Sequence, residues 1–157
     1  MIPHKGPHRT HHRVPLVICL LVVLALGACC SKEKGETPAG NAVNWLKSFD
    51  TAMAASRDKN LPVMIDFYTD WCGWCKRLDS DTYVDAQVIA AARGFVSVKI
   101  NADEDRTTAT RYGITGFPTI LFVDSMGNEI HRIVGYRPPQ AFLAEMNQAL
   151  AAFEGRS

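Results

Sequence analysis

The chain has 157 residues, of which 47% are hydrophobic and 21% are charged, and its formal net charge is +1. This length fits one domain with a short extension, and the composition is typical of a folded globular protein rather than a disordered one. Of the five cysteines, only Cys72 and Cys75 lie beyond the first thirty residues. That uneven distribution excludes a small domain held together by many disulfides.

The first 28 residues are predicted to be a signal peptide. Three basic residues precede an apolar run at residues 14–26, which only Pro15 interrupts. The run is shorter than the about 20 apolar residues that a membrane-spanning helix needs. It fits the hydrophobic region of a secretory signal instead, so we expect the protein to be exported.

The end of this run predicts attachment to a membrane. Residues 26–29 read LGAC, which resembles the bacterial lipobox, so Cys29 is the expected lipidation site and the first residue of the mature chain. The alternatives are a plain signal peptide cleaved after Ala28 and an uncleaved anchor. Multiple acyl chains on Cys29 would hold the domain at the membrane. In a bacterium with two membranes, the absence of an aspartate after Cys29 favours the outer one.

A flexible linker is expected at residues 29–42. Residues 31–41 are polar, contain glycine and proline, and have no apolar residue larger than alanine. Without the leader, 14 of the 17 Lys and Arg residues remain against 16 Asp and Glu, so the net charge is near −2. The remaining chain has no net positive charge that would attract nucleic acid. The folded domain is expected at residues 43–157.

Strands and helices are predicted to alternate in this domain. Apolar runs and period-two alternation indicate strands at 43–45, 61–68, 95–100, 119–123 and 129–134. Helical spacing of apolar residues indicates helices at 48–58, 76–80, 85–92 and 106–112, and from 138 onward. Ser48 and Asp85 are expected N-caps, and Gly113 is an expected C-cap.

The order of these elements predicts the fold class. Helices that connect successive strands favour parallel pairing, and the hairpin near the end of the chain favours an antiparallel edge. We therefore expect a three-layer α/β/α fold with a central mixed sheet.

Cys72 and Cys75 are the candidate reactive residues. Cys72 follows a predicted strand and opens a predicted helix, where backbone N–H groups and the helix dipole stabilise a thiolate. Cys75 lies one helical turn further on, close enough to attack a mixed disulfide formed at Cys72. Gly73 leaves room beside the nucleophile, and Trp74 adds an apolar surface. The spacing therefore favours disulfide exchange.

Two other interpretations of the cysteine pair are weaker. A structural zinc site needs four ligands, and His131 is the only histidine outside the leader. A purely structural disulfide is disfavoured because so short a loop removes little entropy from the unfolded chain. No cofactor is predicted, since Gly113 and Gly116 belong to the turn before Pro118 and form no phosphate loop.

Three motifs resemble the thioredoxin superfamily. They are DFYTDWCGWCK at 66–76, KINAD at 99–103 and YGITGFPT at 112–119, and their order and spacing match from about residue 43 to the C-terminus. Within the superfamily the chain is most similar to the C-terminal periplasmic domain of DsbD-type thiol–disulfide interchange proteins and to related exported lipoproteins. The resemblance implies a thioredoxin fold.

The resemblance also implies roles for the residues that contact a substrate. Cys72 would attack, Cys75 would resolve, and the two would close a disulfide. Pro118 matches a cis-proline beside that disulfide, and Phe117 would offer its backbone N–H and C=O to a substrate strand. The alternative is a trans Pro118 that merely begins a strand.

The remaining matches concern an acid and two tryptophans. Asp66 matches a buried acid with a raised pKa that relays the proton of Cys75, and Lys99 matches its partner. A purely structural ion pair is the alternative. Trp71 and Trp74 are candidates for a lid or docking surface. Trp71 matches a family aromatic, and its alternative role is simple packing. Trp74 stands where thioredoxin has proline, which leaves the direction of electron flow open.

Together these features predict an exported, membrane-tethered thiol–disulfide oxidoreductase that reduces disulfides of partner proteins. Because the mature chain would lack a membrane span, a membrane-embedded thiol reductant is implied as the electron donor. A monomer is expected. The alternatives are a disulfide oxidase or isomerase, and a thioredoxin-like module that binds clients without turnover.

Overall fold

The computed structural model describes residues 41–156 of the chain. The predicted signal peptide (1–28), Cys29 and all but the last two residues of the predicted linker (29–42) lie outside the described residues. Within residues 41–156, no helix combines the length and apolar character that a membrane crossing requires.

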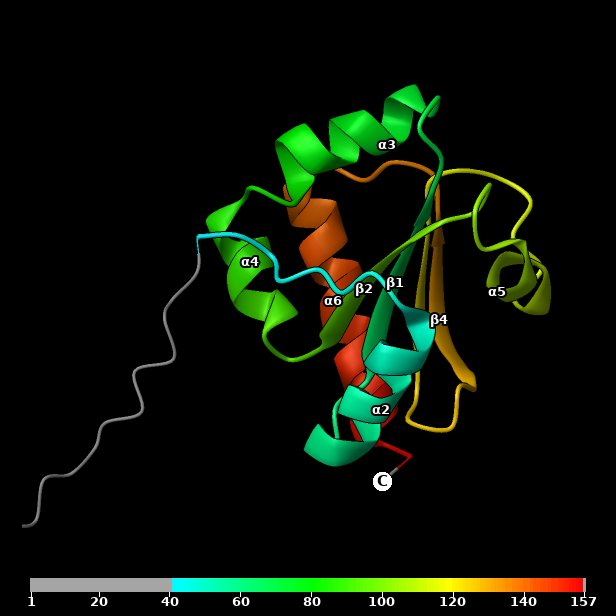
Figure 1. Cartoon of the computed structure of the whole chain (residues 1–157). Coiled ribbons are helices and arrows are strands. Elements are labelled where there is room, and N and C mark those ends of the chain that lie inside the picture. Colours follow the sequence, from blue (N-terminus) through cyan, green and yellow to red (C-terminus); the bar gives the residue numbers. More distant parts are fainter. Residues whose placement is uncertain (1–40, 157) are drawn as a thin grey trace, which may run out of the picture. The chain divides into compact units, whose positions relative to one another are not determined.

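Four strands form one mixed sheet, in the order β2-β1-β3-β4 (Figure 1). The first strand, β1 (Val63–Tyr68), pairs in parallel with β2 (Val96–Asn101). It pairs on its other side with β3 (Thr119–Val123), which is antiparallel to it, and β4 (Glu129–Val134) continues the sheet as an antiparallel hairpin. The fold is the predicted mixed α/β sheet.

The direction of β3 differs from the expectation that connecting helices imply parallel strands. The only helix between β2 and β3 is α5 (Arg106–Arg111). Six helical residues span about 9 Å, which is too short to carry the chain back along the length of the sheet. The chain therefore enters β3 from the end at which β2 finishes, and β3 runs antiparallel to β1.

Helices cover both faces of the sheet, as a three-layer fold requires. Phe49, Ala52 and Met53 of α2 (Phe49–Lys59) and Ala109 of α5 belong to the core on one face. On the other face, the core contains residues of α4 (Ala86–Ala92) and α6 (Pro139–Glu154). Each core also includes alternate residues of the strands, because successive side chains of a strand point to opposite faces.

Two helix starts follow the predicted capping pattern. The Ser48 hydroxyl accepts a hydrogen bond from the Thr51 N–H at 3.3 Å, at the start of α2. The Asp85 carboxylate accepts from the N–H groups of Gln87 and Val88, at 2.8 and 3.1 Å, at the start of α4. Both caps satisfy backbone donors that a helix leaves unpaired at its first turn.

The helix opens at Cys72, as predicted, but it extends two residues past its predicted end at residue 80 and changes type along its length. It begins as α3 (Gly73–Arg77) and continues as the π-helix η1 (Leu78–Thr82). In Figure 1, α3 lies across the end of the sheet at which β1 finishes. Single π-helical turns occur frequently at functional sites, and this one directly follows the cysteine pair.

The predicted strand at 43–45 is wrong. Instead, a single parallel bridge joins Leu46 to Val98 of β2. The Leu46 N–H donates to the Ser97 C=O at 2.9 Å, and the Lys99 N–H donates to the Leu46 C=O at 3.0 Å. The segment that leads into α2 therefore lies along the outer edge of β2 without forming a regular strand.

This segment changes the environment of β2. Val96, Val98 and Ile100 face the α2 core, as the period-two pattern predicts. The polar residues between them are also buried, so every residue of β2 is withdrawn from water. A buried polar face needs partners, and Lys99 on that face leads to the candidate site.

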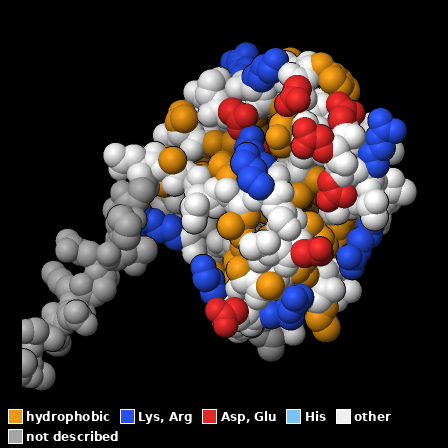
Figure 2. Space-filling model, in the orientation of Figure 1, with side chains coloured by type: hydrophobic (Ala, Val, Ile, Leu, Met, Phe, Trp, Pro, Cys, Tyr) orange, Lys and Arg blue, Asp and Glu red, His pale blue; other side chains and the backbone are white. Residues whose placement is uncertain are grey.

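Charged side chains of both signs are interspersed over the face seen in Figure 2, with apolar side chains visible between them. This mixture is typical of the surface of a soluble domain.

Candidate functional site

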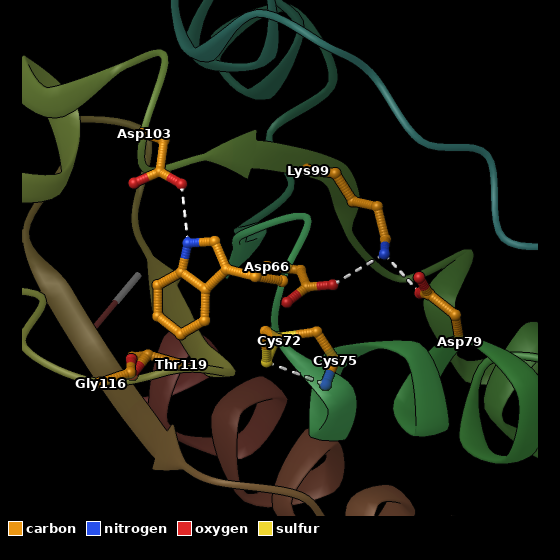
Figure 3. Close-up of a disulfide and its surroundings, with 9 residues drawn as sticks. Asp66, Cys72, Cys75, Asp79, Lys99, Asp103, Gly116 and Thr119 are labelled. Atoms are coloured by element: carbon orange, nitrogen blue, oxygen red, sulfur yellow. Dashed lines mark hydrogen bonds and ion pairs between the residues drawn. A yellow bond between two sulfur atoms is a disulfide. The ribbon is translucent and has the colours of Figure 1, made fainter.

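The two cysteines lie where the chain passes from β1 into α3, and they form a disulfide (Figure 3). Their sulfur atoms are 2.14 Å apart. Cys72 is the N-cap residue of α3, and its Sγ accepts a hydrogen bond from the Cys75 N–H at 3.1 Å. Both residues are buried, with 5% and 3% of their surface exposed. A donor aimed at Sγ favours the thiolate of Cys72 once the disulfide is reduced.

The Phe117–Pro118 peptide bond is cis, as the resemblance implied. Thr119, the first residue of β3, is the register partner of Phe67. Pro118 therefore lies level with Tyr68, the last residue of β1, from which the chain leads to Cys72. The Thr119 hydroxyl donates to the Gly116 C=O at 2.8 Å, which ties this loop to the start of β3 (Figure 3).

Trp71 is 70% exposed, so it is not simply a core residue. Its indole N–H donates to the Asp103 carboxylate at 3.0 Å, and its ring meets the Phe117 ring edge-on at 5.8 Å. Trp71 and Phe117 thus form one apolar wall next to the cysteine pair. A Cβ placed on Gly73 would meet no atom within 4 Å, so the space beside Cys72 is open.

Trp74 belongs to a second aromatic group. It is 57% exposed and stacks on Tyr136 with ring centroids 5.7 Å apart. The Arg77 guanidinium carbon lies 5.1 Å from the Tyr136 centroid and 5.9 Å from the Trp74 centroid. Trp74, Gly135, Tyr136 and Arg137 line a shallow groove of about 290 Å³. One lining residue of this groove, Trp74, stands between Cys72 and Cys75 in the sequence.

Asp66 and Lys99 form a buried ion pair. The Lys99 Nζ is 3.1 Å from Asp66 Oδ2, and the two residues are 9% and 1% exposed. Burial raises the pKa of Asp66, and this effect outweighs the opposing influence of the Lys99 charge. In Figure 3 the Asp66 carboxyl lies on the same side of the disulfide as Lys99. The arrangement suits an acid that exchanges a proton near the cysteines.

Lys99 has a second carboxylate partner, Asp79 of η1, which contacts the same Nζ (Figure 3). Burial alone would lower the pKa of Lys99, but the charges and hydrogen bonds of Asp66 and Asp79 together raise it. Nearby Tyr83 is buried, and burial followed by the charges of both acids raises its pKa well above the ordinary 10.0. Lys99 therefore stays charged and Tyr83 stays neutral at physiological pH.

The sequence did not predict four residues of this region: Asp79, Tyr83, Asp103 and Tyr136. Asp79 lies four residues after Cys75, which places both on one side of a continuous helix and is the one signal that sequence offered. Asp103 is the last residue of the KINAD motif, but its hydrogen bond with Trp71 depends on the loop after β2. Tyr136 reaches Trp74 from the loop after β4, a contact that no sequence spacing reports.

No group of three or more His, Cys, Asp or Glu side chains in residues 41–156 is arranged to hold a metal ion. The cysteine pair is closed as a disulfide, and His131 pairs with Glu145 at 2.6 Å instead.

The mixed four-stranded sheet, together with a cysteine pair at the start of a helix beyond β1, defines a protein of the thioredoxin fold with a dithiol–disulfide site. Residues 49–150 match the family of thioredoxin-like domains. The chain belongs to this family.

Individual relatives agree with this assignment. The chain is 34% identical over 119 residues to the thiol:disulfide interchange protein DsbD of Ralstonia nicotianae, a match that covers 73% of the chain and 20% of the relative. The chain thus spans about a fifth of the length of the curated relatives it matches.

Solved structures give the same fold. A thioredoxin from Thermus thermophilus matches with a TM-score of 0.62 and 28% identity, over 68% of this chain and 86% of that one. The C-terminal domain of Neisseria meningitidis DsbD, in the oxidised form, matches with a TM-score of 0.59 and 24% identity, over 68% of this chain and 99% of that one. The latter likeness concerns the fold alone.

Proposed function

We propose that the protein is an exported thiol–disulfide oxidoreductase that reduces disulfides of partner proteins. The observation that carries this proposal is the hydrogen bond from the Cys75 N–H to Cys72 Sγ at the start of α3. It favours the thiolate at Cys72, which is the form that attacks a disulfide. Cys75, whose thiol is needed to complete the exchange, is close enough to Cys72 to form a disulfide with it.

The reaction proceeds in two exchanges. In the reduced protein, the Cys72 thiolate attacks one sulfur of the substrate disulfide, forming a mixed disulfide and releasing the other sulfur as a thiolate. Cys75 then passes its proton to the Asp66 carboxylate and attacks Cys72 Sγ. This step breaks the mixed disulfide and releases the second substrate thiolate. Two electrons pass from the cysteine pair to the substrate, and Cys72–Cys75 is left oxidised.

The substrate would be held as an extended chain along the surface around the disulfide. The backbone of Phe117, next to cis-Pro118, would offer strand-like hydrogen bonds. Trp71 would line one side and Trp74 the other, and the open space at Gly73 would admit the substrate chain. Lys99 would keep Asp66 in place rather than contact the substrate.

We further propose that the protein works at the cell envelope. The relatives that it matches are named as thiol:disulfide interchange proteins, and the leader predicts a signal peptide at 1–28, lipidation at Cys29 and a linker to residue 42. A membrane-embedded thiol protein would return electrons to the oxidised pair, and the domain would act as a monomer on the periplasmic side. Export and tethering are tested together by labelling with a radioactive fatty acid, which should disappear in Cys29→Ala.

Insulin reduction tests the activity. With dithiothreitol as the electron source, the protein should accelerate precipitation of the insulin B chain, and Cys72→Ser should abolish the acceleration. Cys75→Ala should retain the attack but not the release, so mixed disulfides with clients should accumulate and be identifiable by mass spectrometry. Insulin reduction that survived Cys72→Ser would sink the assignment of that residue.

The direction of electron flow is tested by the reduction potential. A reductase should equilibrate with glutathione at a potential well below the about −120 mV of strong disulfide oxidants. A value near that oxidising limit would replace the reductase with an oxidase or isomerase. Absence of trapped clients in Cys75→Ala, together with unimpaired client binding, would favour the module that binds without turnover.

A further inference from the structure

Three aromatic rings surround the Lys99 ammonium group, in addition to its two carboxylates. The Lys99 Nζ lies 5.4 Å from the ring centroid of Trp45, 5.1 Å from that of Tyr68 and 5.3 Å from that of Tyr83. Each distance is within the range at which the negative face of an aromatic ring attracts a cation. Because Lys99 is only 9% exposed, water contributes little to holding this charge in place.

Trp45 reaches this group from outside the regular elements of the fold. It belongs to the segment before α2, and its neighbour Leu46 bonds to the backbone of β2 on both sides of Val98, once through the Lys99 N–H. The Trp45 ring also meets the Tyr83 ring edge-on at 4.8 Å. The match to the thioredoxin-like family begins at residue 49, four residues after Trp45.

The position of the ammonium group matters for Asp66. Lys99 supplies the positive charge that opposes the effect of burial on the Asp66 carboxyl, at a distance of 3.1 Å. Asp79 contacts the same Nζ from η1 and is about half exposed. If one wall of the aromatic group were lost, Lys99 would be free to follow Asp79 toward solvent. Asp66 would then keep its burial and lose its nearest positive charge.

We propose that Trp45 is a positioning residue of the disulfide site, which holds the Lys99 ammonium against Asp66 and thereby sets how readily Asp66 accepts a proton. This inference deepens the proposed function and rests on it in one respect, namely that Asp66 takes the proton of Cys75. It makes the segment before α2 part of the chemistry of the site.

The ionisable groups that face Lys99 come from two elements and from the residue that follows one of them. Asp66 and Tyr68 lie on β1, Asp79 lies on η1, and Tyr83 follows η1. Two further acids, Asp70 and Glu104, act on Tyr68. Of the three rings, only Trp45 carries no titratable group. A change in Asp66 after replacement of Trp45 therefore cannot arise from loss of a proton-binding side chain.

The test follows the Asp66 carboxyl directly, by carbon-13 NMR of the oxidised protein labelled at aspartate. Trp45→Leu removes the ring and keeps an apolar side chain, and it should raise the titration midpoint of Asp66 by about half a pH unit, the equivalent of one modest cation–π contact. Trp45→Phe keeps a ring and should give a smaller rise. Asp66→Asn identifies the resonance.

Phe49→Leu is the matched control, because it also replaces an aromatic residue near the start of α2 but packs in the core on the opposite face of the sheet. It should lower stability and leave the Asp66 midpoint unchanged. An Asp66 midpoint in folded Trp45→Leu equal to that of wild type would overturn the proposal and leave Trp45 a packing residue. If Trp45→Leu does not fold, an unshifted midpoint in Trp45→Phe overturns it equally.

This measurement needs no client and no turnover, so its failure is distinguishable from failure of the proposed function. If insulin reduction were absent and the Asp66 midpoint still moved, Trp45 would remain a positioning residue of a site with another use. If the protein reduces insulin and the Asp66 midpoint also moves, the pH at which Cys75 resolves a trapped mixed disulfide should rise in Trp45→Leu by the same amount as the Asp66 midpoint.

Discussion

Asp66 and Lys99 are register partners in the parallel pair of β1 and β2, and their charged groups meet at 3.1 Å. Although a positive charge lies beside it, Asp66 has a raised pKa, because the loss of water on burial outweighs the attraction of the ammonium group. The folded protein therefore holds a carboxyl that binds its proton more tightly than in the unfolded chain. Such an acid costs stability whenever it is ionised.

Replacing Asp66 should flatten the pH dependence of stability. The pKa of Asp66 is above the ordinary 3.8 in the folded protein. The cost of ionised Asp66 to the free energy of unfolding is therefore absent below pH 3.8 and grows as the pH rises through the raised pKa. Asp66→Asn should not show this fall. Urea unfolding of the oxidised protein from pH 4 to 8, in which neither cysteine titrates, measures the difference. An equally steep fall in the variant would assign the dependence to another group.

Removing Lys99 should lower stability and make its pH dependence steeper. Lys99→Met leaves Asp66 buried without its positive partner, and breaking such a pair typically costs about 3–5 kcal/mol. The loss should be largest at high pH, where Asp66 would ionise, and the double variant Lys99→Met/Asp66→Asn should recover much of it. Lys47→Met removes an exposed lysine and should change the free energy of unfolding by no more than about 0.5 kcal/mol.

Tyr136 should affect the handling of protein clients. Tyr136→Leu removes the ring that stacks on Trp74 and lies under Arg77, so the KM for a protein disulfide should rise several-fold while kcat changes little. Tyr136→Phe keeps the ring and loses only the hydrogen bond to Asp81, so it should remain close to wild type in KM. A parallel loss of kcat in Tyr136→Leu would indicate damage to the cysteine pair instead.

Gly127 should resist substitution. Its φ of +86° is a conformation that side chains with a Cβ rarely adopt, and a Cβ there would lie 3.2 Å from Arg111 Nη2 and from the Tyr112 hydroxyl. Gly127→Ala should lower the free energy of unfolding by about 1–3 kcal/mol. Gly155→Ala is the control, since its φ is −70° and its nearest contact would be 3.5 Å. Equal losses in the two variants would contradict this reasoning.

Much of the fold could be predicted because the signals were local. The Asp85 cap and the apolar run at 119–123 depend only on neighbouring residues, and both elements are where the sequence placed them. The direction of β3 depends on the reach of α5, and the absence of a strand at 43–45 depends on how that segment meets β2. These are tertiary relations that periodicity does not report.

The candidate site was predictable to a similar degree. The cis-proline and the contact between Asp66 and Lys99 followed from resemblance, and the structure contains both. The second carboxylate on Lys99 was missed because its contact joins η1 to β2, a tertiary relation that sequence spacing does not report. The aromatic ring of Trp45 was missed because its segment was expected to be an ordinary edge strand.

The attachment of Leu46 to β2 also bears on solubility. A free strand edge with the alternating apolar residues Val96, Val98 and Ile100 is a template for pairing with another chain. Leu46 occupies part of that edge through its two backbone hydrogen bonds to β2. A protein shortened to begin at Ser48 would keep every helix and strand that the structure describes in residues 41–156 and would still be expected to self-associate through β2. We therefore expect the stretch just before α2 to protect the domain from aggregation.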